Sequence, residues 1–376
     1  MIHWMFLASD LLFYLLLLFV FFYLIFVYQH DHLQKIWKSI FTQPAAKVSF
    51  CIVLFYITIA LLDSMHFIVL KDRFGFKADP YTARSVLDLS LMPLPVINEE
   101  TYSAPFSKHL YQKEWMPTKT GTMQNLFIPL KHTPHIMGTN KIGQDVFYIA
   151  IKSIRTGVLL GALTTLLMLP FAIIAAIPAG YFGGWIDDLV QFVYITLSSI
   201  PGVLLIAASI LAMQIYVEAH PNWFLTNTVR ADIRLLTLCA ILGLTSWTTL
   251  CRIIRAETLK LRESDFVLAA RAMGKGSMGI MLRHILPNIS HLVLITVVLD
   301  FSALVMAEAV LTYIGVGVDP NMYSWGNMIA AARLELAREP VVWWPLMSAF
   351  VLMFIFILAI NLFADGVRKG FSPRER

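Results

Sequence analysis

Long runs of apolar residues divide this 376-residue chain, and they constrain its fold more than any other feature. A helix needs about 20 apolar residues to cross the hydrocarbon core of a bilayer. Seven stretches meet or approach that length: Leu11–Tyr28, Val48–Leu70, Gly157–Gly180, Leu189–Val217, Leu235–Cys251, His291–Val318 and Val341–Ala364. Charged residues make up only 14% of the chain, which is too few to cover a water-facing surface. The sequence therefore predicts an all-α, polytopic membrane helical bundle.

Lysine and arginine residues set the expected orientation, because short cytoplasmic connectors are enriched in them. The connectors on the side of segment 252–290 and of the C-terminal tail carry thirteen lysines and arginines, and the short connectors on the other side carry four. We therefore expect the N-terminus outside and the C-terminus in the cytoplasm. The longest hydrophilic piece, Lys71–Thr156, then faces outward. Because seven prolines lie between Pro80 and Pro134, we expect this piece to be irregular, with short helices at most.

Segment 252–290 holds the most informative local pattern in the sequence. Apolar residues recur at helical spacing over 259–273, and Gly274 can end this helix in the left-handed conformation. Ser277 is placed to cap a second short helix, which Pro287 closes. The predicted apolar face consists of Leu259, Phe266, Ala269, Ala270 and Met273. The sequence thus predicts a helix, a glycine turn and a second helix between two membrane spans.

Four ordered motifs resemble the inner-membrane permease subunits of dipeptide/oligopeptide-type ABC importers, the inner membrane components of binding-protein-dependent transport systems. The run Asp-Phe-Val-Leu-Ala-Ala-Arg-Ala-Met-Gly at 265–274, followed by Arg-His-Ile-Leu-Pro-Asn at 283–288, is similar to the cytoplasmic coupling loop of that family. Leu268 stands where the family often has glutamate. The other three motifs lie at Met137–Val146, Ala179–Asp187 and Glu308–Met328.

The resemblance implies the six-helix permease core of a type I ABC importer, with Leu11–Tyr28 as one extra N-terminal transmembrane helix. It divides the chain into three parts. Residues 1–46 form the extra helix and a short cytoplasmic linker, and 47–156 form the first core helix and the proline-rich extracytoplasmic segment. Residues 157–376 form the permease core, which includes the coupling loop 252–290. The location implied is the bacterial inner membrane.

By the same resemblance, the chain forms half of a translocation pathway for peptides and couples to separate ATPase subunits. The implied partners are a second homologous permease, two cytoplasmic ATPase subunits, an extracytoplasmic solute-binding protein and membrane lipid, with no nucleic acid. The coupling residues implied are Leu268, Ala269, Ala270, Arg271, Gly274, Ser277 and Pro287.

We expect no enzymatic activity and no cofactor in this chain, with ATP and Mg²⁺ bound by the partner subunits. Met273–Ser277 contains glycine and lysine but lacks the spacing of a phosphate-binding loop. The histidine pairs His30/His32 and His132/His135 have no supporting cysteine or carboxylate cluster, so we expect no metal site.

Two carboxylates, Asp300 and Glu308, lie within the apolar stretch His291–Val318. Such groups are costly at bilayer depth unless they face protein or water, so they are candidates for a functional site. Eight residues correspond to two helical turns plus about 80°, so both could face a pore. Glu308 could line the pathway or could hydrogen-bond to a neighbouring helix. An ion-coupled secondary transporter that uses both carboxylates is the alternative function.

Three prolines interrupt apolar stretches and predict kinks: Pro170, Pro178 and Pro201. Proline removes a backbone donor, and neighbouring groups in a membrane bundle can satisfy the carbonyl that it leaves free. A kink at Pro201 could serve a gate or only local packing, and the sequence leaves both open.

Overall fold

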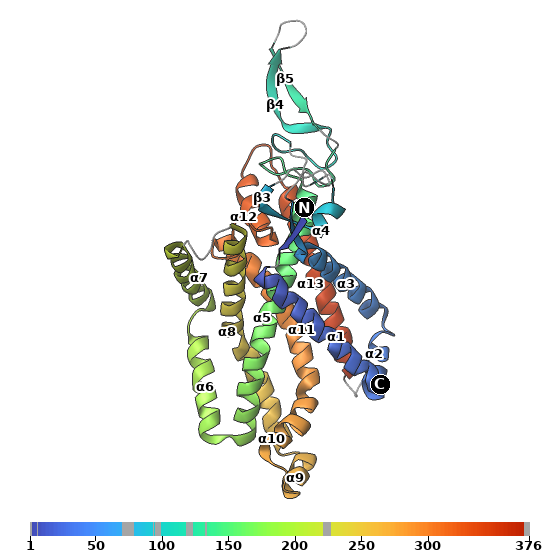
Figure 1. Ribbon diagram of the computed structural model, residues 1–376, viewed down its shortest axis with the longest axis vertical. Coiled ribbons are helices and arrows are strands. Elements are labelled where there is room, and N and C mark those ends of the chain that lie inside the picture. Colours follow the sequence, from blue (N-terminus) through green and yellow to red (C-terminus); the bar gives the residue numbers. More distant parts are fainter. Residues whose placement is uncertain are drawn as a thin grey trace.

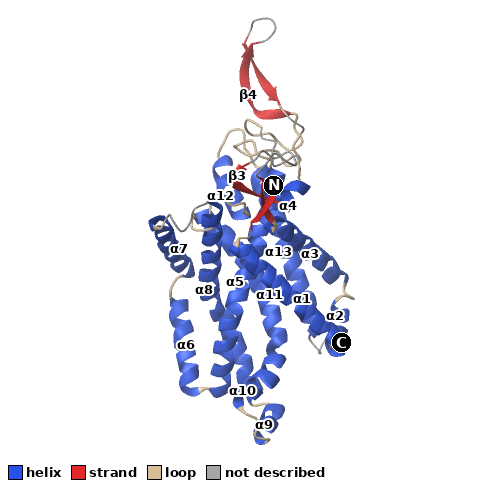
Figure 2. Cartoon of the chain, in the orientation of Figure 1, coloured by secondary structure: helices blue, strands red, loops and turns tan. Residues whose placement is uncertain are grey.

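The computed structural model describes residues 2–5, 7–69, 79–92, 94, 99–117, 123–131, 134–220 and 227–371. In this part of the chain, long helices form a bundle with a small region of strands at one end (Figure 1). Six helices are long and apolar enough to cross a membrane: α1 (Ala8–Gln29), α3 (Pro44–Ser64), α5 (Val146–Phe182), α8 (Asn227–Arg262), the continuous helix from α10 (Ser277–Ile280) through α11 (Leu286–Ile314), and α13 (Trp344–Phe371). The prediction of a polytopic helical bundle is confirmed, and Figure 2 shows how strongly helix dominates.

The stretch Leu189–Val217, predicted as one span, is divided into α6 (Gly184–Ser199) and α7 (Gly202–Ala219), which are bent by 82°. The break lies at Pro201, where a kink was predicted. The residue before a proline is pushed out of the helical region, and Ile200 is extended. Pro170 and Pro178 do not divide their helix, because α5 continues through both.

The described residues of the proline-rich segment include strands, so the prediction of short helices at most is wrong. Antiparallel strands β1 (Ile2–Met5), β2 (His66–Val69) and β3 (Asp79–Ser85) form one sheet, followed by α4 (Val86–Ser90). Strands β4 (His109–Pro117) and β5 (Met123–Pro129) form a projecting hairpin (Figure 1). Pro117 and Pro129 each end a strand of this hairpin, where a missing N–H costs the ladder little.

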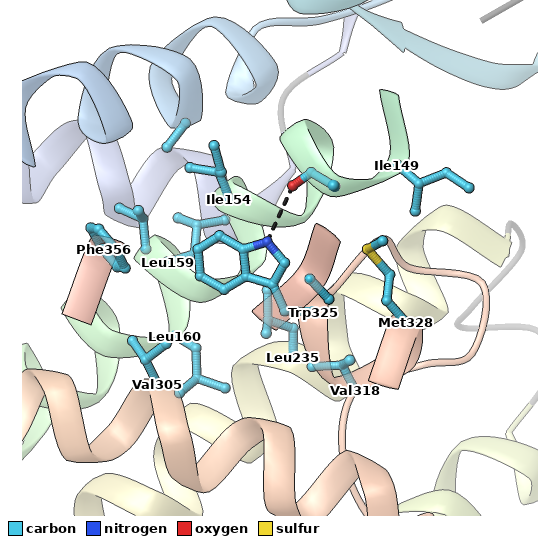
Figure 3. Close-up of a cluster of buried hydrophobic side chains, with 14 of the residues drawn as sticks. Ile149, Ile154, Leu159, Leu160, Leu235, Val305, Val318, Trp325, Met328 and Phe356 are labelled. Atoms are coloured by element: carbon cyan, nitrogen blue, oxygen red, sulfur yellow. Dashed lines mark hydrogen bonds between the residues drawn. The ribbon is translucent and has the colours of Figure 1, made fainter. Parts of the chain in front are cut away.

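The main core of the bundle surrounds Trp325, at the start of α12 (Trp325–Glu335) (Figure 3). Its indole N–H donates to the carbonyl of Ala150 in α5 at 3.2 Å. The ring packs near Tyr56 of α3 and Phe356 of α13, which stack on each other with centroids 4.7 Å apart. Helices α3, α5, α12 and α13 therefore share one buried aromatic centre.

The predicted division of the chain at 156/157 falls inside α5. This helix begins at Val146, after Asp145 has capped it by accepting from the N–H of Tyr148 at 3.0 Å. The first eleven residues of α5 therefore belong to the bundle, although they are more polar than the apolar run that follows. The three-part division itself stays a prediction.

Candidate coupling loop and intramembrane carboxylates

Segment 252–290 lies at the end of the bundle opposite the strands (Figure 1). Helix α8 ends at Arg262, and Ser264, in extended conformation, precedes the short helix α9 (Asp265–Ala272). The predicted helix over 259–273 is therefore broken near Ser264. Gly274 has a φ of +76°, and a Cβ built on it would meet no atom within 4 Å. Glycine is required there by the backbone conformation rather than by crowding.

The second helix of the loop differs from its prediction at both ends. Gly276, not Ser277, is the N-cap residue, and Ser277 is the exposed first residue of α10 without a side-chain capping bond. Pro287 does not close the helix, because it lies in the first turn of α11. The π-helical turn Met281–Ile285 comes directly before it. Such a turn lets a membrane helix continue past the missing N–H of a proline.

The face that the loop turns to the bundle shares only Ala270 with the predicted one. Val267 and Ala270 are buried, and they pack with Tyr181 and Ile280 in one apolar cluster. Of the predicted face, Phe266, Ala269 and Met273 point outward instead. The chain breaks near Ser264, so α9 is a separate short helix and does not continue the face predicted for 259–273.

The exposed part of the loop forms an apolar surface, which we call the loop tip: Phe266, Leu268, Met273, Met278 and Leu282. Met273 is the most exposed of the five, at 79%. Ala269 and Arg271 are exposed beside this surface. Phe266, Leu268 and Met273 lie outside the candidate spans, where exposed apolar side chains are characteristic of a protein contact.

Two contacts join the loop region to the turn between α5 and α6, and sequence reasoning missed both. The carboxylate of Asp187, in the first turn of α6, accepts two hydrogen bonds from Arg255 of α8, one of them from Nη2 at 2.6 Å. The Arg271 guanidinium of α9 lies 5.3 Å from the centroid of the Tyr181 ring. Tyr181 and Asp187 flank two glycines with positive φ, in the motif that was recognised. No local pattern gave their partners.

Glu308 is buried in the C-terminal half of α11. Its Oε1 accepts from the hydroxyl of Thr312 at 2.8 Å. A Cβ on Gly326, in the first turn of α12, would lie 2.8 Å from the same oxygen, so that glycine allows the close approach. This geometry favours the interpretation in which Glu308 anchors a neighbouring helix. Asp300 is half-buried, and its Oδ2 has no partner among the described residues. Within the described ranges, no hydrogen bond joins the two carboxylates.

A buried charge network lies at the strand end of the bundle, and the sequence did not predict it. Arg155 of α5 donates to Asp10 of α1 at 2.6 Å, and the His66 ring nitrogen Nδ1 lies 2.9 Å from the other oxygen of Asp10. Lys152, one turn earlier, lies 2.8 Å from Asp88 and 3.4 Å from Asp63.

Asp88 lies in α4, outside the spans, and burial by itself would raise its pKa. The ammonium of Lys152 and hydrogen bonds from Ser85 and Tyr148 outweigh burial, so the pKa of Asp88 is held below its ordinary value. Loss of this carboxylate charge would leave Lys152 with Asp63 alone at longer range.

Of the second histidine pair, only His135 lies within the described residues. His135 is buried, and its Nδ1 lies 2.7 Å from Asp145 Oδ2, so it supports the N-terminus of α5. Its predicted companion His132 lies outside the described residues. Across the described ranges, no group of three or more His, Cys, Asp or Glu residues is placed to hold a metal ion.

Comparisons with known proteins agree with the motifs. Residues 147–376 match the family of binding-protein-dependent transport system inner membrane components. The oligopeptide transport system permease protein OppC of Mycobacterium tuberculosis (strain H37Rv) is 30% identical over 244 residues, which cover 65% of this chain and 77% of the relative. A putative peptide permease protein of Brucella suis is 31% identical over 265 residues, covering 69% and 80%. The dipeptide transport system permease protein DppC of Alkalihalophilus pseudofirmus is 27% identical over 242 residues, covering 64% and 73%.

This chain belongs to the family of binding-protein-dependent transport system inner membrane components. It is a multi-pass inner-membrane protein. The family match begins one residue into α5, so α1, α3 and the strand region lie outside it.

Proposed function

We propose that this chain is a permease subunit of an ABC importer and forms half of a translocation pathway for peptides. The names of the relatives support peptide as the solute, because they are described as oligopeptide, dipeptide or putative peptide permeases. The other half of the pathway comes from a second homologous permease, and an extracytoplasmic solute-binding protein delivers the solute. The N-terminus is periplasmic and the C-terminus cytoplasmic, as the distribution of lysine and arginine favours.

ATP and Mg²⁺ bind in two separate ATPase subunits, and the loop 252–290 receives their motion. One observation carries this part of the proposal: the loop tip exposes apolar side chains, while Val267 and Ala270 fix the same short helix to the bundle. A partner that binds the exposed side of this helix can move the bundle, because the other side of the helix is packed against the bundle. The Asp187–Arg255 pair gives that movement a route into α6.

The function is tested by reconstituting the chain into liposomes with its second permease, its ATPase subunits and its binding protein. We expect uptake of a radiolabelled oligopeptide that depends on ATP and is competed by unlabelled peptide. Omission of the ATPase subunits should abolish uptake. Uptake driven by a proton or sodium gradient without them would contradict the proposal. That result would favour the alternative, an ion-coupled transporter that uses Asp300 and Glu308.

The coupling surface is tested by cysteine crosslinking. Met273→Cys at the loop tip should form a disulfide-length crosslink to an ATPase subunit, in a Cys51→Ser background because Cys51 is exposed. Leu334→Cys, equally solvent-exposed but on α12 at the opposite end, is the matched control and should form none. Crosslinks from neither position in any nucleotide state would refute the assignment of the loop while leaving the uptake result intact.

A further inference from the structure

An apolar groove lies between α1 and the rest of the bundle. It has a volume of about 250 Å³ and is lined entirely by apolar side chains from α1, α3, α5, α11 and α13. Phe13 and Val20 of α1 form one wall, and Val53 of α3 and Val298 of α11 belong to the facing walls. Val20 is also exposed on the outer surface of α1, so the groove lies beside the lipid phase. Water gains nothing in such a space, because it offers no hydrogen-bond partner.

The groove follows α1 along the depth of the membrane. Phe13 lies near the strand end of α1, and Phe363 lines the groove near the C-terminal end of α13. The Phe363 ring stacks with Trp37, with centroids 6.5 Å apart. Trp37 belongs to α2 (Asp31–Ile40), the short helix that joins α1 to α3. The groove therefore ends beside α2.

Helix α2 is amphipathic and begins where a spanning helix stops, which is the usual place of a helix lying in the membrane interface. Its apolar side packs against α13, where Ile40 meets Gly370 so closely that a side chain on that glycine would displace it. Lys35 and Lys38, three residues apart, are exposed on the other side. Exposed lysines at the membrane surface attract anionic headgroups.

We propose that α1, α2 and the helices behind them bind one anionic glycerophospholipid. One acyl chain occupies the groove, and the headgroup phosphate is held by Lys35 and Lys38. The charge of α2 selects this occupant over a protein helix, because an apolar protein segment would place no anion at the lysines. The extra N-terminal part of the chain then acts as a lipid clasp on the permease core. This inference does not depend on the solute that the chain transports.

The test is native mass spectrometry of the delipidated full chain, titrated with phosphatidylglycerol or with phosphatidylcholine. Val298→Trp and, independently, Val53→Trp fill the groove from two walls and should abolish binding of both lipids. Leu299→Trp, on the exposed side of the same helix, is the matched control and should bind as the unaltered chain does. Two groove variants make it possible to separate a filled groove from a single misfolded protein.

The headgroup is tested with Lys35→Gln and Lys38→Gln together. Each lysine near an anionic surface contributes roughly fivefold in affinity, so the pair should weaken phosphatidylglycerol binding about 30-fold. Phosphatidylcholine binding should not change, and neither should the affinities of Lys108→Gln, which removes an exposed lysine at the strand end. Equal losses for both lipids would contradict recognition of the phosphate charge.

A photocrosslinking residue in place of Val20 identifies what covers the groove in membranes. A phospholipid adduct supports the proposal. Capture of the second permease subunit would overturn it, and so would groove-filling variants that bind phosphatidylglycerol unchanged.

Discussion

Asp10 and Arg155 form a buried ion pair that joins a helix outside the family match to the first helix within it. The two side chains meet at 2.6 Å, with Asp10 inaccessible to solvent and Arg155 only 6% exposed. His66 shares Asp10. The neighbouring Ser9 donates to Asp232 of α8. Helix α1 is thus held by buried charge at its N-terminal end, although most of its apolar side chains are exposed.

Removing one member of this pair should destabilise the chain strongly. Arg155→Met leaves the Asp10 carboxylate buried without its guanidinium, which costs about 3–5 kcal/mol in comparable sites. The double variant Asp10→Leu with Arg155→Met should lose less than the sum of the two single variants, because neither member of this pair is left buried without the other. Unfolding of the purified chain in mixed micelles of increasing dodecyl sulfate content measures both.

The matched control is the exposed pair Asp365–Arg368. Arg368→Met should change the free energy of unfolding by less than about 1 kcal/mol. Strict additivity of the Asp10 and Arg155 variants would show that the two side chains stabilise the chain independently.

The lowered pKa of Asp88 predicts a defined acid dependence. A depressed folded-state pKa contributes stability that is fully present above the unfolded value, 3.8, and is lost as pH falls through the lower folded value. The difference in thermal midpoint between the unaltered chain and Asp88→Asn should be constant above about pH 5 and should shrink below 3.8. A difference that grows on acidification would contradict the ion pair with Lys152.

The sequence predicted elements whose cause is local. Apolar runs long enough for a membrane predicted the spanning helices, and Gly274 was expected to take the left-handed conformation that it has. The strands were missed because the prolines were taken to allow short helices at most, whereas proline is compatible with strand ends such as Pro117. The sequence predicted a kink at Pro201 but not the 82° bend that divides the stretch into two helices.

In the candidate site too, local features were predicted and contacts between distant residues were not. Loop residues could be identified as candidates because motif and glycine spacing are continuous in sequence. Asp187 and Arg255 are 68 residues apart, and Asp10 and Arg155 are 145 apart, so only the fold brings them together. A usable signal was present nonetheless. Lys152 and Arg155 lie one turn apart directly before an apolar run, which is where a spanning helix can begin earlier than its apolar residues.

Gly274 should tolerate only residues that accept a positive φ. Gly274→Val places a β-branched residue in the left-handed region, at a cost of about 1–2 kcal/mol or more. That cost lowers the population of the native loop roughly 5–30-fold, and ATP-dependent peptide uptake should fall accordingly. Gly274→Asn should retain most uptake, because asparagine enters this region more readily.

Gly276 is the matched control for that substitution. It is two residues away and equally free of neighbours, but its φ is −64°. Gly276→Val should leave uptake within about twofold of the unaltered chain, since no left-handed conformation is involved. Equal losses at 274 and 276 would mean that bulk at the loop, and not backbone conformation, impairs transport.

Reversing the charges of the Asp187–Arg255 pair tests whether it transmits motion from the loop into α6. Asp187→Arg alone, or Arg255→Asp alone, places two like charges together. Two like charges at close range cost several kcal/mol. Uptake by the reconstituted transporter should fall about tenfold or more while ATP hydrolysis persists, so more ATP is consumed for each peptide. The double reversal restores the attraction and should return uptake to within about threefold.

The readout separates transmission from simple loss of structure. Co-purification of the ATPase subunits with each single variant would show that the complex still assembles, and the ratio of ATP hydrolysed to peptide transported then reports coupling alone. The exposed pair Asp365–Arg368 of α13 takes no part in this contact, and reversing it should leave the ratio unchanged. If the single reversals lowered uptake and ATP hydrolysis in equal proportion, the pair would stabilise the bundle without transmitting motion. Loss of transmission alone lowers uptake but not ATP hydrolysis, whereas loss of a folded subunit lowers both.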